Sequence, residues 1–174
     1  MAYVSKFETE LGVGAVVASE QGVQRVYLPH DGIEDTLVRD GFTVKPSSDL
    51  TERVALMLKQ YFKGEQQPFE SVPVDLNLSS QFRRQVLELI RSIPFGAVLS
   101  YGKVASLAGS PGAARAVGGA MAANPVPIII PCHRVIAANG RLTGYTAPGG
   151  LKIKKNILQM EGVEFKGELV CQEK

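Results

Sequence analysis

The pattern of apolar and polar positions differs between the two halves of the chain. In the first half, residues 13–18 and 23–28 are short runs rich in β-forming residues. Gln21 and Gly22 lie between them, where Gly favours a tight turn. Two such runs joined by a short turn predict a β-hairpin.

A helix and a further strand are predicted after this hairpin. Residues 50–62 repeat apolar positions at helical spacing, and Gly64 follows as a stop signal. Residues 72–76 alternate in polarity, and Pro73 restricts them to the edge of a sheet because it has no N–H to donate. The first half is therefore predicted to be a small α/β domain, and it contains no motif with an evident chemistry.

The second half begins with three short helical patterns. Each follows a residue suited to begin a helix, namely Ser at the N-cap or Pro at the first helical position. The predicted helices are residues 82–93 after Ser79 or Ser80, residues 101–108 after Ser100, and residues 112–123 after Ser110 and Pro111. Three helices joined by short turns favour a helix-turn-helix unit.

Two further elements complete the prediction. Residues 126–130 form an apolar run between prolines and predict a buried strand, and residues 153–160 predict an amphipathic helix. The change of character near residues 76–80 predicts two domains, residues 1–76 and residues 77–174.

The predicted helix over residues 112–123 is unusually thin. Its only long side chains are those of Arg115, Val117 and Met121. Gly118 and Gly119 each cost roughly 1 kcal/mol in a helix interior relative to Ala, so a specific need for small residues is expected. Tight packing against another helix is one explanation. The other is close approach to a nucleic-acid groove, with Arg115 as the projecting group.

Composition limits the class of protein. The chain has 174 residues, of which 45% are hydrophobic and 21% charged, and this balance excludes wholesale disorder. No apolar run approaches the ~18 residues of a membrane span, and no secretory signal is visible, so no membrane association is expected. Two cysteines are too few for a disulfide framework. Reduced thiols in the cytoplasm are expected, with a nucleoid or, in a eukaryote, a nuclear location.

The net charge of +2 hides an uneven distribution. Residues 1–76 contain 7 Lys and Arg against 12 Asp and Glu, whereas residues 77–174 contain 12 against 5. The 72 residues between Glu88 and Glu161 contain no acid. Such asymmetry favours a polyanionic partner for the basic half, although an uneven solvated surface would look the same.

Cys132 is the candidate for chemistry. A lone cysteine is most often an inert apolar residue, but this one precedes His133 and Arg134, and such neighbours favour the thiolate. A metal site is disfavoured, because the two cysteines and two histidines are widely scattered. A thiol hydrolase would need a group that orients the histidine, and both Glu161 and Asn124 are available.

The residues around this cysteine resemble those of the O6-alkylguanine-DNA alkyltransferases. The matching segments are residues 115–121 (RAVGGAM), 124–127 (NPVP) and 130–135 (IPCHRV), with Ser100-Tyr101-Gly102 upstream and Tyr145 and Glu161-Gly162 downstream. The resemblance covers roughly residues 78–163 and is highly specific, whereas residues 1–76 resemble the family only loosely.

The resemblance implies a single-turnover DNA-repair enzyme that uses no cofactor and no metal. Its thiolate, here Cys132, would take a methyl or other alkyl group from O6-alkylguanine, and from O4-alkylthymine, in double-stranded DNA after base flipping. His133 would be the base acting through water, with Glu161 orienting it. Asn124 would hold the active-site turn.

The resemblance also implies the residues that contact DNA and the fold. Tyr101 would rotate the nucleotide and supply a proton, and Arg115 would fill the gap in the base stack. The other expected contacts are Gly102, Ser110, the main chain of Val135, and Tyr145 and Thr146 at the pocket wall. The expected fold is a ribonuclease-H-like α/β N-terminal domain followed by a mainly α winged helix-turn-helix domain, acting as a monomer from the minor groove.

Two other function classes remain open at this point. A non-catalytic lesion binder would not need the thiol, so Cys132 argues against it. A thiol hydrolase would turn over many times, whereas the thioether formed by alkyl transfer has no easy exit.

Overall fold

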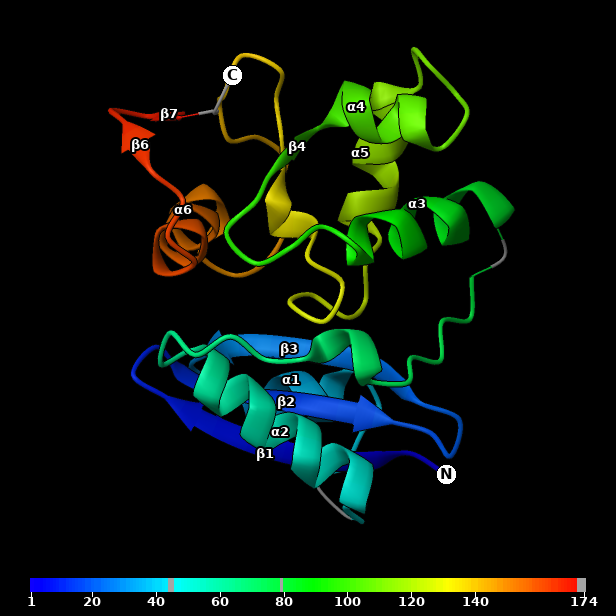
Figure 1. Cartoon of the computed structure of the whole chain (residues 1–174). Helices are drawn as coiled ribbons and strands as arrows, with labels where there is room; N and C mark the ends of the chain where they lie inside the picture. Colours follow the sequence, from blue (N-terminus) through cyan, green and yellow to red (C-terminus); the bar gives the residue numbers. More distant parts are fainter. Residues whose placement is uncertain (44–45, 79, 172–174) are drawn as a thin grey trace. The chain divides into compact units, whose positions relative to one another are not determined.

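The structure is a computed structural model that describes residues 1–43, 46–78 and 80–171. The chain folds into two compact units (Figure 1). The first comprises Met1–Asn77 together with Pro125–Ile129, and the second comprises Leu78–Asn124 and Ile130–Lys174. The sequence placed a domain boundary at residues 76–77, but it did not predict that residues 125–129 would fold with the first unit.

The first unit is built on a three-stranded antiparallel sheet in the order β1-β2-β3. The strands are β1 (Tyr3–Thr9), β2 (Gly12–Ala18) and β3 (Val23–His30). The hairpin predicted for residues 13–28 is present as β2 and β3. Strand β1 was not predicted, because its polar and apolar residues do not alternate cleanly: Ser5 is buried between Val4 and Lys6.

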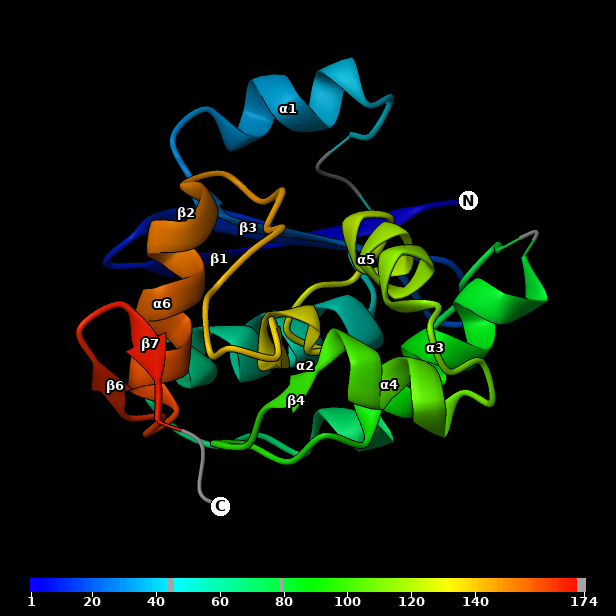
Figure 2. The same cartoon turned by 90° about the horizontal axis from the view of Figure 1, so that it is seen from above.

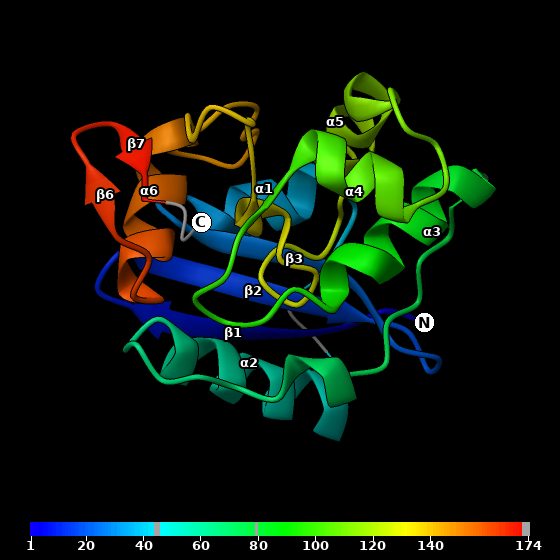
Figure 3. The same ribbon diagram turned by 45° about the horizontal axis from the view of Figure 1, so that its top comes forward.

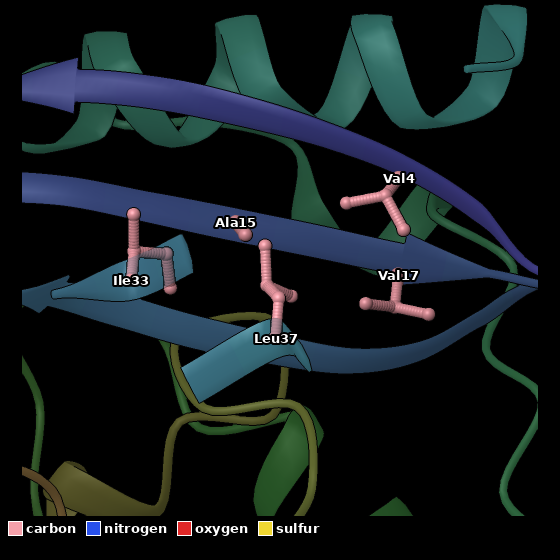
Figure 4. Close-up of a cluster of buried hydrophobic side chains, with 5 residues drawn as sticks. All are labelled: Val4, Ala15, Val17, Ile33 and Leu37. Carbon is pink, nitrogen blue, oxygen red and sulfur yellow. The ribbon is translucent and has the colours of Figure 1, made fainter. Parts of the chain in front are cut away.

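Two helices lie against this sheet. Helix α2 (Asp49–Tyr61) packs on β1 and β2 and begins with a capping box between Ser48 and Thr51, which explains its strong sequence signal. Helix α1 (Ile33–Arg39) packs on β2 and β3. It was missed, because it has only seven residues and its N-cap, Gly32, has no side chain to signal the start of a helix. Figure 4 shows the cluster that joins α1 to the sheet, made of Val4, Ala15, Val17, Ile33 and Leu37.

The edge strand predicted for residues 72–76 is wrong. A short 3-10 helix, η1 (Phe69–Ser71), precedes this segment, and only an isolated parallel bridge joins Val74 to Val23. Val23 donates its N–H to the carbonyl of Pro73, and Asp75 donates to the carbonyl of Val23, both at 2.9 Å. Two hydrogen bonds tie the segment to β3 without forming a strand.

The second unit contains the three helices predicted from capping signals. They are α3 (Gln81–Arg91), α4 (Tyr101–Leu107) and α5 (Ala114–Ala122), and they pack against one another (Figure 2). The side chains of Ser80 and Ser100 cap α3 and α4 by accepting from the backbone N–H three residues later. The alternative cap, Ser79, lies outside the described residues.

Helix α5 begins two residues later than predicted. Gly112 has a φ of 88°, a left-handed conformation that cannot continue a helix, and Ala113 donates to the carbonyl of Ser110 to close a turn. Within the helix, a Cβ added to Gly118 or Gly119 would meet no atom within 4 Å. Tight packing therefore does not explain these glycines, and the face they form is open.

The buried strand predicted for residues 126–130 is also wrong. The segment is buried but turns, and Ile128 has a φ of 72°, the only positive value among the described non-glycine residues. A β-branched residue in this conformation is strained, and flanking prolines remove N–H donors that a ladder would need. Pro125 instead accepts a hydrogen bond from the N–H of Val26 at 2.9 Å.

The rest of the second unit surrounds a 3-10 turn, η2 (Cys132–Arg134), which contacts both α3 and α6 (Figure 3). It leads into β5 (Val135–Ile136), which pairs in parallel with β4 (Leu99–Ser100). Helix α6 (Gly150–Met160) starts three residues before the predicted helix, after Gly149 in a left-handed conformation. A hairpin of β6 (Phe165–Lys166) and β7 (Leu169–Val170) follows. In the described parts of the chain, no helix is long and apolar enough to cross a membrane.

Candidate active site

The thiol of Cys132 lies at the first position of η2 and is buried, with 7% of the residue exposed. Burial raises the pKa of this thiol, because a thiolate is poorly solvated in a low-dielectric environment. A hydrogen bond from Asn124, the charge of Lys154 and the backbone N–H groups of the turn oppose that effect. The resting thiol is therefore protonated, with groups already placed to stabilise its anion.

The carbonyl of Ile130 fixes the position of the thiol. It accepts from the side-chain amide of Asn124 at 2.9 Å and from the backbone N–H of Cys132 at 2.8 Å. The chain leaves the second unit after Asn124 and returns at Ile130. The Asn124 side chain thus joins the residue at which the chain leaves the second unit to the residue at which it returns.

His133 is fully buried and points to the end of α6. Its Nε2 lies 2.9 Å from Oε1 of Glu161, which is the C-cap residue of that helix and is 4% exposed. The sequence left open whether Glu161 or Asn124 orients the histidine, and the structure pairs Glu161 with it.

Arg134 is buried beside the same carboxylate. Its Nε donates to Oε2 of Glu161 at 2.9 Å and its Nη2 donates to Oε1 at 2.8 Å, which makes a bidentate ion pair. Its Nη1 donates to the carbonyl of Ile93 at 2.6 Å. Arg134 is therefore held by the site and is not available to bind phosphates. The acid-free stretch had favoured a polyanionic partner for the basic residues of this half.

The pKa values in this cluster follow from burial and pairing. Burial lowers the pKa of His133, since an imidazolium is costly to bury, and this outweighs the opposing effect of Glu161. Burial alone would raise the pKa of Glu161, but the bonds from His133 and Arg134 lower it to about 2. At neutral pH the site thus contains a neutral imidazole beside a carboxylate, and a neutral imidazole can accept a proton.

Lys154 is a second buried cation that the sequence did not single out. It is 1% exposed, and its Nζ donates to the carbonyls of Val135 at 2.7 Å and Thr143 at 3.0 Å. Burial lowers its pKa to about 8. It lies 5.9 Å from the ring centres of both Tyr101 and Tyr145. The sequence could have indicated that Lys154 faces the site, because it precedes Glu161 by seven residues, which is two turns along the same helix face.

The two tyrosines differ in their hydroxyl groups. The hydroxyl of Tyr101 donates to the carbonyl of Thr143 at 3.0 Å, whereas the buried hydroxyl of Tyr145 has no hydrogen-bond partner among the described residues. Burial raises the pKa of both, and that of Tyr145 well above 10. Both therefore remain phenols at neutral pH and can donate a proton or a hydrogen bond.

The remaining expected DNA contacts lie at or near the surface. Arg115, Gly102 and Thr146 are exposed and Ser110 is half-buried, whereas Val135 is buried with its carbonyl engaged by Lys154. In the described part of the second unit, no hydrogen bond or ion pair joins these exposed residues to Cys132, which suits residues that would touch a larger ligand. Within the described ranges, no three His, Cys, Asp or Glu side chains gather as a metal site would require.

The sequence was compared with known protein families and proteins. Residues 81–163 match the model described as "6-O-methylguanine DNA methyltransferase, DNA binding domain". A methylated-DNA–protein-cysteine methyltransferase of Methanosarcina acetivorans is 36% identical over 163 residues, which are 92% of this chain and 98% of that protein.

Solved structures give the same result. The O6-methylguanine methyltransferase of Mycobacterium tuberculosis superposes with a TM-score of 0.77 at 34% identity, covering 92% of this chain and 93% of the other. A structure of Mycobacterium tuberculosis OGT in complex with DNA gives a TM-score of 0.75 at 34% identity, covering 91% and 92% of the two chains.

Proposed function

Because the chain belongs to the methylated-DNA–protein-cysteine methyltransferase family, we propose that Cys132 is the cysteine that receives the alkyl group. Family membership confirms the resemblance drawn from the sequence, and with it the predicted class of function, DNA repair by alkyl transfer. DNA is accordingly the partner, and the fold is mixed α/β with a DNA-binding domain. The residue roles that follow are part of the proposal.

The chemistry begins with the thiol proton. His133 accepts it through a water molecule, and Glu161 holds the imidazole in place and stabilises the resulting imidazolium. The thiolate of Cys132 then attacks the alkyl carbon on O6 of guanine. The new bond joins sulfur to that carbon, the carbon–oxygen bond breaks, and its electron pair stays with the base.

The leaving base needs a proton as this charge develops. In this proposal the phenol of Tyr101 supplies it, and the raised pKa of Tyr101, which keeps the phenol protonated at neutral pH, supports that role. His133 holds the proton taken from the thiol and can restore the phenol afterwards, so the reaction balances without a cofactor. The thioether has no easy leaving group, and the enzyme therefore reacts once.

An O6-alkyl group inside a duplex cannot reach a buried thiol, so the base must be flipped out at a cost of a few kcal/mol. The open, thin face of α5 at Gly118 and Gly119 supports a close approach to the minor groove, with exposed Arg115 filling the vacated stack. On this proposal α4 and α5 form the helix-turn-helix of a winged domain, Gly102 and Ser110 contact the DNA backbone, and the first unit is a ribonuclease-H-like companion.

Base recognition is assigned to main-chain groups and two side chains of the second unit. The main chain at Cys132 and Val135 would read the guanine, while Tyr145 and Thr146 would form the pocket wall. The buried hydroxyl of Tyr145 supports this role, because it has spare hydrogen-bonding capacity among the described residues. O4-alkylthymine, which presents a similar alkyl ether, is proposed as a second substrate of the monomeric protein.

The observation that carries the proposal is the bond between His133 and Glu161 in a site where Asn124 fixes the turn of a buried thiol. The test is the mass of the intact protein after exposure to a duplex with one O6-methylguanine. One methyl mass should be gained, on the peptide that contains Cys132. Cys132→Ala should abolish the gain, and a gain that persists in this variant would overturn the proposal.

The same experiment separates the other function classes. A lesion binder would bind the modified duplex without any change of mass. A thiol hydrolase would release product in many-fold excess over protein, whereas the proposed reaction stops at one equivalent.

A further inference from the structure

The guanidinium of Arg134 contacts the carboxylate of Glu161, a backbone carbonyl and an aromatic ring. Three of its nitrogen atoms donate hydrogen bonds: Nε and Nη2 to the two oxygens of Glu161, and Nη1 to the carbonyl of Ile93. Its guanidinium carbon also lies 5.9 Å from the ring centre of Phe95. Because a guanidinium is planar and rigid, these contacts fix both its position and its plane.

The carboxylate is shared in an asymmetric way. Oε1 of Glu161 accepts a hydrogen bond from Arg134 Nη2 at 2.8 Å and lies 2.9 Å from His133 Nε2. Oε2 accepts from Arg134 Nε at 2.9 Å and, at a longer 3.4 Å, from the N–H of Gly96. The fork of Arg134 engages both carboxylate oxygens at 2.8 and 2.9 Å, so it constrains the rotation of the carboxylate more firmly than the long bond from Gly96 does.

We propose that Arg134 is a positioning residue of the alkyl transfer: its guanidinium fixes Glu161 in the orientation that serves His133 and balances the charge of that carboxylate. This inference rests on the proposed role of Cys132 as acceptor. It extends that role, because none of the comparisons assigns a function to Arg134.

The charges facing His133 make the balance specific. The carboxylate of Glu161 attracts a proton to the imidazole, and the cations of Arg134 and Lys154 oppose it. Two further titratable groups interact with these charges: Cys132 interacts electrostatically with Lys154, and Tyr145 with Glu161. An imidazole that is already protonated cannot accept the thiol proton. Removing the charge of Arg134 would therefore raise the pH at which the base becomes available.

The test is the pH dependence of single-turnover transfer between pH 5 and 9, with protein in excess over a duplex that holds one O6-methylguanine. Arg134→Gln removes the charge and the fork, Arg134→Lys keeps the charge but loses the fork, and Arg141→Gln is the control at an exposed arginine of the same unit. Arg134→Gln should lower the plateau rate about tenfold or more and move the acid limb up by about one pH unit. Arg134→Lys should lower the plateau and leave the acid limb in place.

A merely structural role would reduce stability without moving the acid limb, and that result in Arg134→Gln overturns the proposal. If Arg134→Gln does not fold, Arg134→Lys decides alone, because transfer at the wild-type rate would show that the fork is not needed. Failure of the underlying function looks different: the wild-type protein itself would gain no methyl mass at Cys132.

Discussion

Replacing Glu161 by Gln should destabilise the protein, because this carboxylate is the counter-charge of a buried arginine. Glu161 is 4% exposed and accepts both hydrogen bonds of the Arg134 fork. A glutamine has no charge and only one acceptor oxygen, so the guanidinium would remain buried without compensation. Breaking a buried ion pair from one side typically costs about 3–5 kcal/mol.

The pKa of Glu161 gives the magnitude independently. The ordinary value of 4.5 falls to about 2 in the folded protein, despite burial, because His133 and Arg134 donate to the carboxylate. At about 1.4 kcal/mol per pH unit, this difference corresponds to roughly 3 kcal/mol of stabilisation by the ionised form. A depressed carboxyl pKa stabilises above the unfolded value, so the contribution is complete above pH 4.5 and is lost as pH falls towards 2.

The assay is urea unfolding of wild type, Glu161→Gln and Glu164→Gln at pH 7 and pH 3. Glu164 is an exposed carboxylate three residues away and serves as the matched control. The gap between wild type and Glu161→Gln should be about 3 kcal/mol or more at pH 7, and should shrink by roughly half of that ionic contribution at pH 3. A gap that is the same at both pH values, or no larger than the Glu164→Gln gap, would refute the reasoning.

Four further predictions concern other residues of the second unit. Arg115→Ala should slow repair of duplex DNA but leave reaction with free O6-benzylguanine largely intact, since the role proposed for the arginine is to fill the base stack; equal losses would contradict this role. Gly119→Ala should raise the free energy of unfolding by up to about 1 kcal/mol and weaken duplex binding measured by fluorescence anisotropy, because its Cβ meets open space in the free protein. Asn124→Ala should raise the pKa of Cys132 and slow its modification by iodoacetamide at neutral pH, and an unchanged rate would remove Asn124 from the site. The free energy of unfolding of the wild type should rise by up to about 3 kcal/mol between pH 8 and 10.5, because a lysine whose pKa is lowered to about 8 disfavours the folded state until it loses its proton. Lys154→Met should not show this rise, and parallel pH curves for the two proteins would argue against the reasoning.

Capping serines are local signals, and they located α3 and α4 correctly. Ser80 and Ser100 cap α3 and α4 through hydrogen bonds that span only three residues, so the sequence contains all that is needed to predict them. The strand predicted at residues 126–130 failed for a related reason. Its apolar run looks like a buried strand, but Ile128 adopts a left-handed φ of 72° that turns the chain, and the pattern of apolar residues gives no sign of that conformation.

The candidate nucleophile and its histidine were identified from the sequence, because their motif is short, contiguous and specific to one family. The charged residues around them were not identified from the sequence. Arg134 and Lys154 lie in the acid-free stretch that favoured a polyanionic partner, yet both are buried and bond to Glu161, Val135 and Thr143. The sequence by itself determined the reactive residue types and the helices around them. Only the tertiary structure decided which charges face each other, because a buried cation is distinguished from a solvated one by partners that are 11 to 41 residues away, and no local pattern encodes those contacts.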